Sequence, residues 1–322
     1  MKHLFVLNPV AGKGQPLKLI PEIRSYFAEC GHEYDIELSE YSGHATDIVR
    51  RYAGKARQEQ ELRIYSVGGD GTVNEIVNGI IQSGNSAYCS LAVIPSGSGN
   101  DFFKSIPHGE SFHDLLSYSV NGATEPIDIA VVNGRYFANI ASFGFDAEVV
   151  FHAQAIKKFS WIPGALSYFA SILLTVFHYK NLHMVVTVDD QTIDARCLLL
   201  AIANGKYYGG GILPAPEARI DDGLLDICLI REKNFLEILT TLHKYVKGKH
   251  RGLPGVSFYK SGEVKVVCDQ ETALNIDGEI VQGRKAVFKV IPGAINLVVP
   301  YIEHYTGREQ AAAAQSETVS GL

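Results

Sequence analysis

The sequence predicts an α/β protein of two domains, a parallel doubly wound sheet followed by an antiparallel β-sandwich-like domain. Two observations support this fold class. Short apolar strands alternate with segments of helical periodicity through the first part of the chain, and later hairpin signals replace that alternation. We place the first domain at 1–128 and the second at 129–298, with a return to the first domain at 299–306 and a disordered tail at 307–322.

Composition and charge argue against several classes of protein. The 322 residues are 46% hydrophobic and 20% charged, which is ordinary for a soluble globular protein. The net charge of −6 and the lack of a run of Lys and Arg argue against nucleic-acid binding. Five cysteines without C-x-x-C spacing argue against a zinc site or a disulfide framework, and no secretory signal opens the sequence. We therefore expect a cytoplasmic protein.

Strands and helices alternate in the first domain. Strands are predicted at His3–Leu7, Tyr34–Leu38, Ile64–Val67 and Ser90–Ile94, and helices at 17–27, 48–56 and 73–81. Ligands of such parallel sheets bind at the carboxyl ends of the strands. Three glycine-rich turns fall at those ends, at Asn8–Gly14, Gly68–Thr72 and Gly97–Asp101. We expect these turns to converge on one ligand.

The turn at Gly68–Thr72 carries the most chemistry. Its glycines permit a tight turn, and Thr72 with Glu75 has the spacing of a capping box at the start of a helix. A helix N-terminus in such a turn suits a phosphate group. Asp70 would repel that phosphate unless a divalent cation bridges the two groups or the carboxylate handles a proton. The alternative is an aspartate that only bonds its own turn.

Hairpins dominate the second domain. Asn133-Gly134 lies between two apolar strand segments and favours a type I′ turn. Further strands are predicted at Val185–Val188, Cys197–Ala203, Leu225–Ile230, Val264–Val267, Ala273–Ile276 and Ala286–Ile291, with helices near 152–180 and 234–247. The segment Trp161–Tyr179 has no Asp, Glu, Lys or Arg, but its Pro, Gly and polar residues favour a buried or membrane-facing helix over a transmembrane span.

Two acidic turns of the second domain are open to a structural and a functional interpretation. Asp221-Asp222-Gly223 and Asp277-Gly278-Glu279 each fit a turn between strands. On the functional interpretation, Asp222 helps to hold a cation, and Asp277 or Glu279 accepts a hydroxyl proton during phosphoryl transfer. The run Gly209–Gly211 suits either a close approach of the backbone to a ligand or a loose loop.

Six motifs in this order resemble those of the bacterial diacylglycerol kinase and sphingosine-kinase-like lipid kinase family. They are Asn8–Gly12, Gly68–Glu75, Pro95–Asp101, Gly209–Gly211, Pro216–Leu224 and Asn275–Glu279. One motif alone would be less specific, because G-G-D-G-T also occurs in NAD kinases and 6-phosphofructokinases. The resemblance implies a first domain of the NAD-kinase and phosphofructokinase type, with a nucleotide bound in the cleft between the two domains.

The resemblance also assigns residues to ATP and Mg²⁺. The nucleotide would contact Asn8, Pro9, Val10, Ala11, Gly12, Ser39, Gly68, Gly69, Asp70, Gly71, Thr72, Val73, Asn74 and Ser98. A structural Mg²⁺ would be held by the Asp222 carboxylate and the main-chain carbonyls of Arg219 and Leu224. Asp70, Asp101 and Asp128 would belong to a charge network linking that ion to a catalytic Mg²⁺.

The activity that the resemblance implies is ATP- and Mg²⁺-dependent phosphorylation of a lipid hydroxyl, most simply of diacylglycerol to phosphatidic acid in phospholipid metabolism. The catalytic residues would be Asp70, Asp277 and Glu279, with Asp277 as the first choice for the proton acceptor. The protein would work peripherally at the inner face of the membrane, without a nucleic-acid partner, and a homodimer is left open. The alternatives are another acceptor (a sphingoid base, a polyprenol or NAD) and a catalytically silent nucleotide- or lipid-binding regulator.

Overall fold

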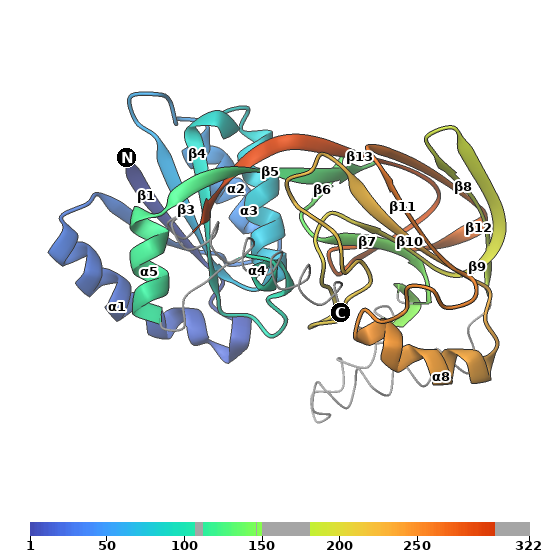
Figure 1. Ribbon diagram of the computed structural model, residues 1–322. Coiled ribbons are helices and arrows are strands. Elements are labelled where there is room, and N and C mark those ends of the chain that lie inside the picture. Colours follow the sequence, from blue (N-terminus) through green and yellow to red (C-terminus); the bar gives the residue numbers. More distant parts are fainter. Residues whose placement is uncertain (107–111, 146, 150–180, 300–322) are drawn as a thin grey trace, which may run out of the picture.

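The computed structural model describes residues 1–106, 112–145, 147–149 and 181–299. Two domains lie side by side and share one continuous hydrogen-bonded sheet (Figure 1). The helix predicted near 152–180, the apolar segment Trp161–Tyr179 and the tail at 307–322 lie outside the described residues, as does the return predicted at 299–306 beyond its first residue. In the part of the chain that is described, no helix is long and apolar enough to cross a membrane.

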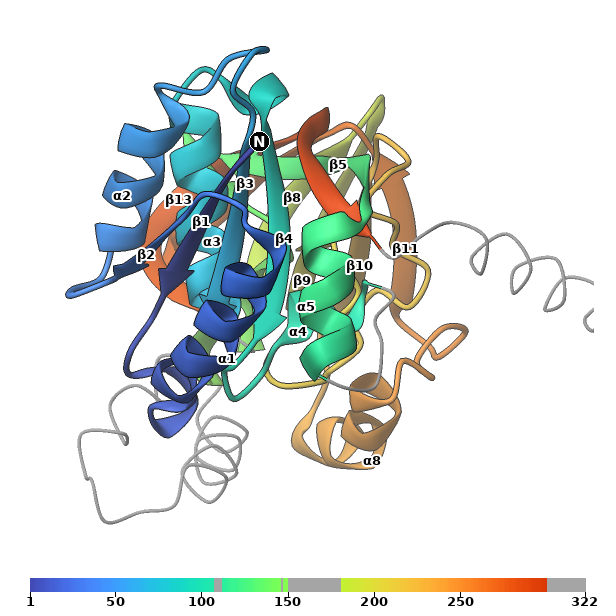
Figure 2. The same ribbon diagram turned by 90° about the vertical axis from the view of Figure 1, so that its left-hand side faces the viewer.

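The first domain is the predicted doubly wound sheet. Its strands are β1 (Lys2–Leu7), β2 (Tyr34–Leu38), β3 (Leu62–Gly68) and β4 (Cys89–Pro95), all paired in parallel in the order β2-β1-β3-β4. Its longer helices are α1 (Gln15–Cys30), α2 (His44–Ala53), α3 (Asp70–Gln82) and α5 (Phe112–Asn121). Helices α1 and α5 cover one face of this sheet, whereas α2 and α3 cover the face toward the second domain (Figures 1 and 2).

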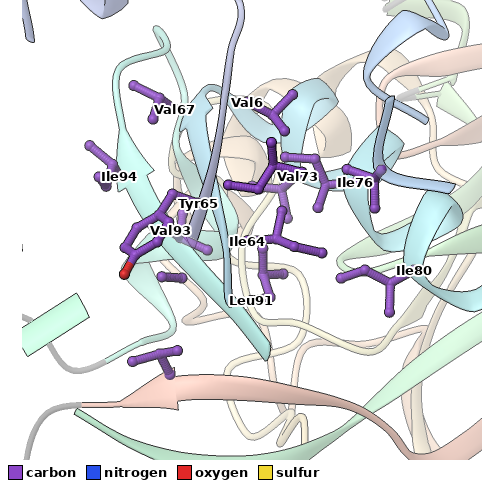
Figure 3. Packing of buried hydrophobic residues seen from close by; sticks show 14 of the residues in the cluster. Val6, Ile64, Tyr65, Val67, Val73, Ile76, Ile80, Leu91, Val93 and Ile94 are labelled. Carbon is purple, nitrogen blue, oxygen red and sulfur yellow. The ribbon is translucent and has the colours of Figure 1, made fainter. Parts of the chain in front are cut away.

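The core of the first domain positions α3. Strand β3 is buried along its whole length because helices cover both of its faces. Val73, Ile76 and Ile80 recur along α3 at intervals of three and four residues, so they share one face of the helix. Figure 3 shows this face against Ile64 of β3 and Val6 of β1. Each such buried side chain contributes about 1.5–3 kcal/mol, which fixes the helix on the sheet.

The helix start that the sequence predicted at Thr72 is wrong. Helix α3 begins at Asp70, and Gly69 precedes it without any side-chain cap. Thr72 is buried inside the first turn, and the Glu75 carboxylate accepts a hydrogen bond from the Ala45 N–H of α2 at 3.0 Å. The capping-box pattern failed because Glu75 points at the neighbouring helix and satisfies an N–H group there.

The second domain is antiparallel throughout, as predicted. Its strands are β6 (Arg135–Phe137), β7 (Ile140–Gly144), β8 (Leu182–Val188), β9 (Gln191–Ala203), β10 (Leu225–Arg231), β11 (Val256–Ser261) and β12 (Glu263–Ile276). Strands β9 and β12 each pair with β8 along one half and with β7 along the other, so the sheet curves around its own core. The predicted strands at Val264–Val267 and Ala273–Ile276 are two halves of β12, separated by a register shift against its neighbour.

Two long strands connect the domains. Strand β5 (Ala123–Val132) and strand β13 (Glu279–Val299) pair with each other, and β13 also pairs with β12. The end of β13 pairs in parallel with β4 through Asn296 and Leu297, so the chain returns to the sheet of the first domain there. The β5–β6 hairpin turns at Asn133 and Gly134, whose φ angles of 48° and 83° agree with the predicted type I′ turn.

Candidate functional site

The three glycine-rich turns meet at the carboxyl ends of β1, β3 and β4, as the sequence predicted. Ser96 donates its main-chain N–H to the Gly68 carbonyl at 2.7 Å, which holds the turn after β4 against the turn after β3. A Cβ atom added to Gly69 would lie 3.2 Å from Gly97 Cα. Gly12 has a φ of +51°, and a Cβ atom there would collide with the Ser96 carbonyl oxygen. Close packing of backbones therefore requires glycine at these positions.

The N-terminus of α3 points into this junction. No side chain caps the helix, so its first N–H groups and the positive end of its dipole face the turns. Asn8, at the end of β1, lies alongside and donates from Nδ2 to Thr72 Oγ1 at 3.4 Å. A helix N-terminus surrounded by glycine backbone is well suited to a phosphate group.

The residues predicted to bind nucleotide lie at this edge of the sheet, but they differ in how far their side chains are exposed there. The segments Asn8–Gly12 and Gly68–Asn74 border the junction, and Ser39 follows β2 with its N–H bonded to the Leu7 carbonyl at 2.9 Å. Ser98 is exposed in the turn after β4. The side chain of Val73 is only 3% exposed in the core, so no more than its backbone can face a ligand. Nucleotide contact itself stays a prediction.

Asp70 and Asp101 form a pair of carboxylates beside the helix start. Asp70 Oδ1 accepts a hydrogen bond at 2.9 Å from the Phe102 N–H in the short helix α4 (Asp101–Lys104). A Cβ atom added to Gly99 would lie 2.9 Å from Asp70 Oδ2 and 3.4 Å from Asp101 Oδ2, so the two carboxylates flank one glycine. Burial raises the pKa of Asp70, the bond from Phe102 opposes that shift, and the charge of Asp101 adds to it. This pair would attract a cation or a proton.

Sequence reasoning missed two partners of Asp101. Lys104 Nζ lies 2.8 Å from Asp101 Oδ1, and the Gly210 N–H donates to Asp101 Oδ2 at 2.7 Å. Gly210 belongs to the run Gly209–Gly211, so this run reaches from the second domain to the first. The close backbone approach suggested for the run is therefore an approach to Asp101. The spacing of three residues between Asp101 and Lys104 was the one signal available for that ion pair.

Asp277 is joined to the same helix through Asn74. It occupies the two-residue turn between β12 and β13, with a φ of 47°. Its carboxylate accepts bonds from the N–H groups of Ala138 at 2.8 Å, Asn139 at 3.1 Å and Ile140 at 2.9 Å. Asn74 Nδ2, one helical turn after Asp70, donates to it at 3.0 Å. Three main-chain donors and one side-chain donor thus surround this carboxylate.

The surroundings of Asp277 favour a proton acceptor that works near neutral pH. Burial raises the pKa of Asp277 to about 6, although its four hydrogen bonds act in the opposite direction. Glu279 differs, since its side chain is 62% exposed and its nearest ion partner is Arg135 at 3.5 Å. The two candidates for the base therefore have contrasting surroundings.

The predicted metal-binding turn around Asp222 is tied to the sheet by a lysine that the sequence did not suggest. Asp222 Oδ1 accepts from the Leu224 N–H at 3.1 Å, and its Oδ2 accepts from Lys260 Nζ at 2.9 Å. Lys260 also lies 3.2 Å from the carboxylate of the buried Asp226, its partner across β10 and β11. Asp128 Oδ2 accepts from the Gly223 N–H at 2.7 Å.

These contacts allow a test of whether the turn fits Mg²⁺. The carboxylates of Asp128, Asp222 and Asp226 gather around the turn with one ammonium group, so negative charge is left in excess. Carboxylate and carbonyl oxygens are the ligands that Mg²⁺ prefers. Among the described residues, no cluster of three acidic, His or Cys side chains could hold a metal by itself. The turn therefore fits a divalent cation if main-chain carbonyls complete its ligands, as predicted for Arg219 and Leu224.

The hydrogen bonds of Asp128 are made to other segments than those of the Asp70–Asp101 pair. Besides Gly223, it accepts a hydrogen bond from the Gly293 N–H at 2.9 Å, and its own N–H donates to the Ile220 carbonyl at 2.6 Å. Asp128 thus orders the Asp222 turn, and no hydrogen bond between described residues joins it to Asp101. The three aspartates that were predicted to form one network therefore form two separate groups, Asp70 with Asp101 and Asp128 with the Asp222 turn.

An apolar cavity of about 260 Å³ lies in the second domain beneath helix α8 (Phe235–Val246). Its walls are mostly aliphatic and aromatic, and include Leu198, Ile230, Ile238 and Tyr245. Tyr208 and Ile212 also line it, and these residues flank the Gly209–Gly211 run that reaches Asp101. Two residues of the cavity wall therefore lie, along the chain, two positions on either side of Gly210, which bonds Asp101.

Comparison with known proteins identifies the class of protein. The diacylglycerol kinase catalytic domain matches residues 2–132, and the YegS C-terminal NAD kinase beta sandwich-like domain matches residues 139–299. A solved structure of a putative diacylglycerol kinase from Bacillus anthracis has the same fold, with a TM-score of 0.72, 24% sequence identity and coverage of 92% of this chain and 97% of that chain.

Individual relatives agree with this assignment. The chain is 31% identical over 273 residues to a probable lipid kinase YegS-like of Shewanella frigidimarina, which covers 84% of this chain and 86% of that protein. It is 28% identical over 278 residues to the diacylglycerol kinase of Bacillus subtilis, with 85% of this chain and 88% of that protein covered. The protein belongs to the diacylglycerol kinase and YegS-like lipid kinase family, which confirms the resemblance noted in its motifs.

Proposed function

We propose that this protein is an ATP- and Mg²⁺-dependent lipid kinase that phosphorylates a lipid hydroxyl, with diacylglycerol as the acceptor and phosphatidic acid as the product. Membership of the family supports a lipid kinase. The observation that carries the proposal is the arrangement along α3, where Asp70 lies at the glycine junction and Asn74, one turn later, holds Asp277 of the second domain. A phosphate-binding junction and a proton acceptor are thereby attached to one rigid helix.

In this proposal, the triphosphate of ATP lies in the junction. The backbone N–H groups at the start of α3 and the glycine backbone around it bind its oxygens. Lys104 neutralises Asp101, and Asp70 remains as the carboxylate at the helix start. Mg²⁺ bound with the nucleotide would supply positive charge that offsets the charge spread over the transferring phosphoryl group.

Asp277 is the proposed general base. Its three main-chain donors are fixed by β6 and β7, whereas the Asn74 amide is a side chain that can turn away. The acceptor hydroxyl would replace that amide and give its proton to Asp277. Its oxygen then bonds to the γ-phosphorus as the bond from the γ-phosphorus to the bridging oxygen breaks, and ADP leaves. A pKa of about 6 suits a base that must be ionised at neutral pH.

The apolar cavity favours a lipid acceptor over a soluble one such as NAD⁺. Its lining is dominated by side chains without charge, and burial of acyl methylenes there is favourable by about 0.8 kcal/mol for each CH₂ group. Tyr208 and Ile212 connect it to the run that touches Asp101. Acyl chains in this cavity would leave the headgroup hydroxyl on the side of the carboxylates.

The test is transfer of labelled γ-phosphate from ATP, with Mg²⁺, to diacylglycerol in mixed micelles, beside a parallel reaction with NAD⁺. We expect label in the lipid fraction and none in NAD⁺. Label in NAD⁺ alone would contradict the lipid acceptor. A protein that binds ATP but labels neither acceptor nor a total lipid extract would support the silent regulator instead.

A further inference from the structure

Helix α8 lies at the lower end of the second domain, below its strands (Figures 1 and 2). A capping box starts it, since Asn234 and Glu237 exchange hydrogen bonds at 3.0 Å and 2.9 Å. Its inner face carries Ile238 and Tyr245, which are buried and line the apolar cavity. The helix is therefore a wall of the proposed lipid pocket.

The outer face of α8 is apolar at its N-terminal end. Leu236 is 68% exposed and Leu239 is 49% exposed. Leu236 and Leu239 are three residues apart, so they lie on the same side of the helix, opposite the cavity. No contact inside the described part of the domain accounts for two leucines in solvent on neighbouring positions.

The other end of the helix is basic. Lys244, Lys247, Lys249 and Arg251 fall within eight residues that contain no Asp or Glu, in a chain whose net charge is −6. Lys247 and Lys249 are exposed, whereas Arg251 is already paired with Glu217 at 2.8 Å. The cations of this group are interleaved with other residues, so they form no continuous run in the sequence.

We infer that this outer face, the exposed Leu236 and Leu239 together with Lys247 and Lys249, docks on a lipid bilayer that contains anionic headgroups. Exposed aliphatic side chains beside lysines are typical of helices that lie in a membrane interface. Each lysine near an anionic surface adds an attraction that salt screens. Docking there would set the wall of the cavity against the bilayer. This docking surface rests on the proposed function for its role, but binding to vesicles can be measured whether or not the protein is a kinase.

The test is sedimentation of the full chain, without ATP, with vesicles of phosphatidylglycerol and phosphatidylcholine or of phosphatidylcholine alone. The variants are Leu236→Ser with Leu239→Ser, and Lys247→Glu with Lys249→Glu. The matched control is Leu17→Ser with Lys18→Glu, an exposed leucine–lysine pair on α1 in the first domain. None of these residues lines the cavity or the proposed catalytic site.

We expect the chain to bind the anionic vesicles, and each α8 variant to bind them at least about tenfold more weakly. The lysine variant should also lose the weakening of binding by salt, and the control should bind as the parent does. A parent chain that stays in solution, or α8 variants that bind like the control, would overturn the inference. So would a leucine variant that changes only the oligomeric state, because the face would then join two copies.

Failure of the proposed function would look different. A chain that needs α8 to bind vesicles but transfers no phosphate to any lipid would support the docking surface and overturn the kinase proposal. A chain that phosphorylates a short-chain diacylglycerol dissolved in buffer, while all variants bind vesicles alike, would do the reverse.

Discussion

Replacement of Asn74 by alanine should move the acid limb of the pH–activity profile to higher pH. Asn74 Nδ2 is the only side-chain donor among the four groups that bond Asp277, at 3.0 Å. A hydrogen bond to a carboxylate stabilises its ionised form, so loss of this bond makes Asp277 easier to protonate.

The expected rise in the pKa of Asp277 follows from the strength of the one hydrogen bond that is lost. A hydrogen bond to a charged group contributes roughly 1.5–3 kcal/mol, and one pKa unit corresponds to about 1.4 kcal/mol. Asn74 is half-buried, so water can reach the space that it leaves, and this favours the lower end of that range. We therefore expect the pKa of Asp277 to rise by about one unit from its value of about 6.

The assay is kcat/KM for lipid phosphorylation between pH 5 and 8.5, since this quantity reports the ionisation of the free enzyme. Asn78→Ala is the matched control. Asn78 lies one turn further along α3 and donates to the same Tyr136 carbonyl at 3.1 Å as Asn74 does, but it does not contact Asp277. It also donates to Asn74 Oδ1 at 3.1 Å, so we expect the limb to move less in this variant than in Asn74→Ala. A limb that stays in place in Asn74→Ala, or moves equally in both variants, would refute the assignment of Asp277 as the base.

Three further predictions concern packing, pH and metal. Gly99→Ala should reduce activity strongly because its Cβ would lie 2.9 Å from Asp70 Oδ2, whereas Gly283→Ala, with open space at its Cβ in β13 and outside the proposed site, should fold and retain ATP binding; calorimetric ATP titration compares them, and equal affinity and turnover would contradict the packing argument. The pKa of buried His3 is lowered to about 4, chiefly by burial, so the unfolded chain binds more protons between pH 4 and 6.5, and stability should fall by about 3 kcal/mol as the pH drops through that window. Urea titrations should show this slope flattened in His3→Phe, and an unchanged slope would assign the acid sensitivity elsewhere. Lys260→Met leaves two carboxylates without their cation, so MgCl₂ should raise the melting temperature of this variant more than that of the parent; an equal rise would show that the lysine and the metal do not share a site.

Local patterns in the sequence predicted the strands of the first domain, the Asn133-Gly134 hairpin and the meeting of the three glycine turns. These features depend on neighbours in the chain, or on the rule that parallel strands bring their carboxyl ends to one edge. The false capping box at Thr72 shows the limit of such patterns, since Glu75 bonds a residue 30 positions away. A partner in another helix cannot be read from the spacing of two residues.

The decisive contacts of the site are long-range. Asn74 and Asp277 are 203 positions apart, and Asp101 and Gly210 are 109 apart. The sequence marked each segment as unusual through its glycines and acids, but only the packing of the two domains decides which of them touch. Lys260 was missed for the same reason, because it lies 38 positions from Asp222 in the sequence. Lys104 differs, since its spacing of three residues from Asp101 was a local signal of the ion pair.

Asp70→Asn shows whether the junction at Asp70 is a catalytic centre. The amide keeps the shape of the side chain and an oxygen for the Phe102 N–H, while it removes a charge that burial and Asp101 disfavour. We predict that phosphate transfer to diacylglycerol falls by about a hundredfold or more, with a melting temperature equal to or above that of the parent. Asp190→Asn, at an exposed hairpin turn, should leave both quantities unchanged. An Asp70→Asn protein that is as stable as the parent and nearly as active would show that the Asp70 carboxylate is not catalytic.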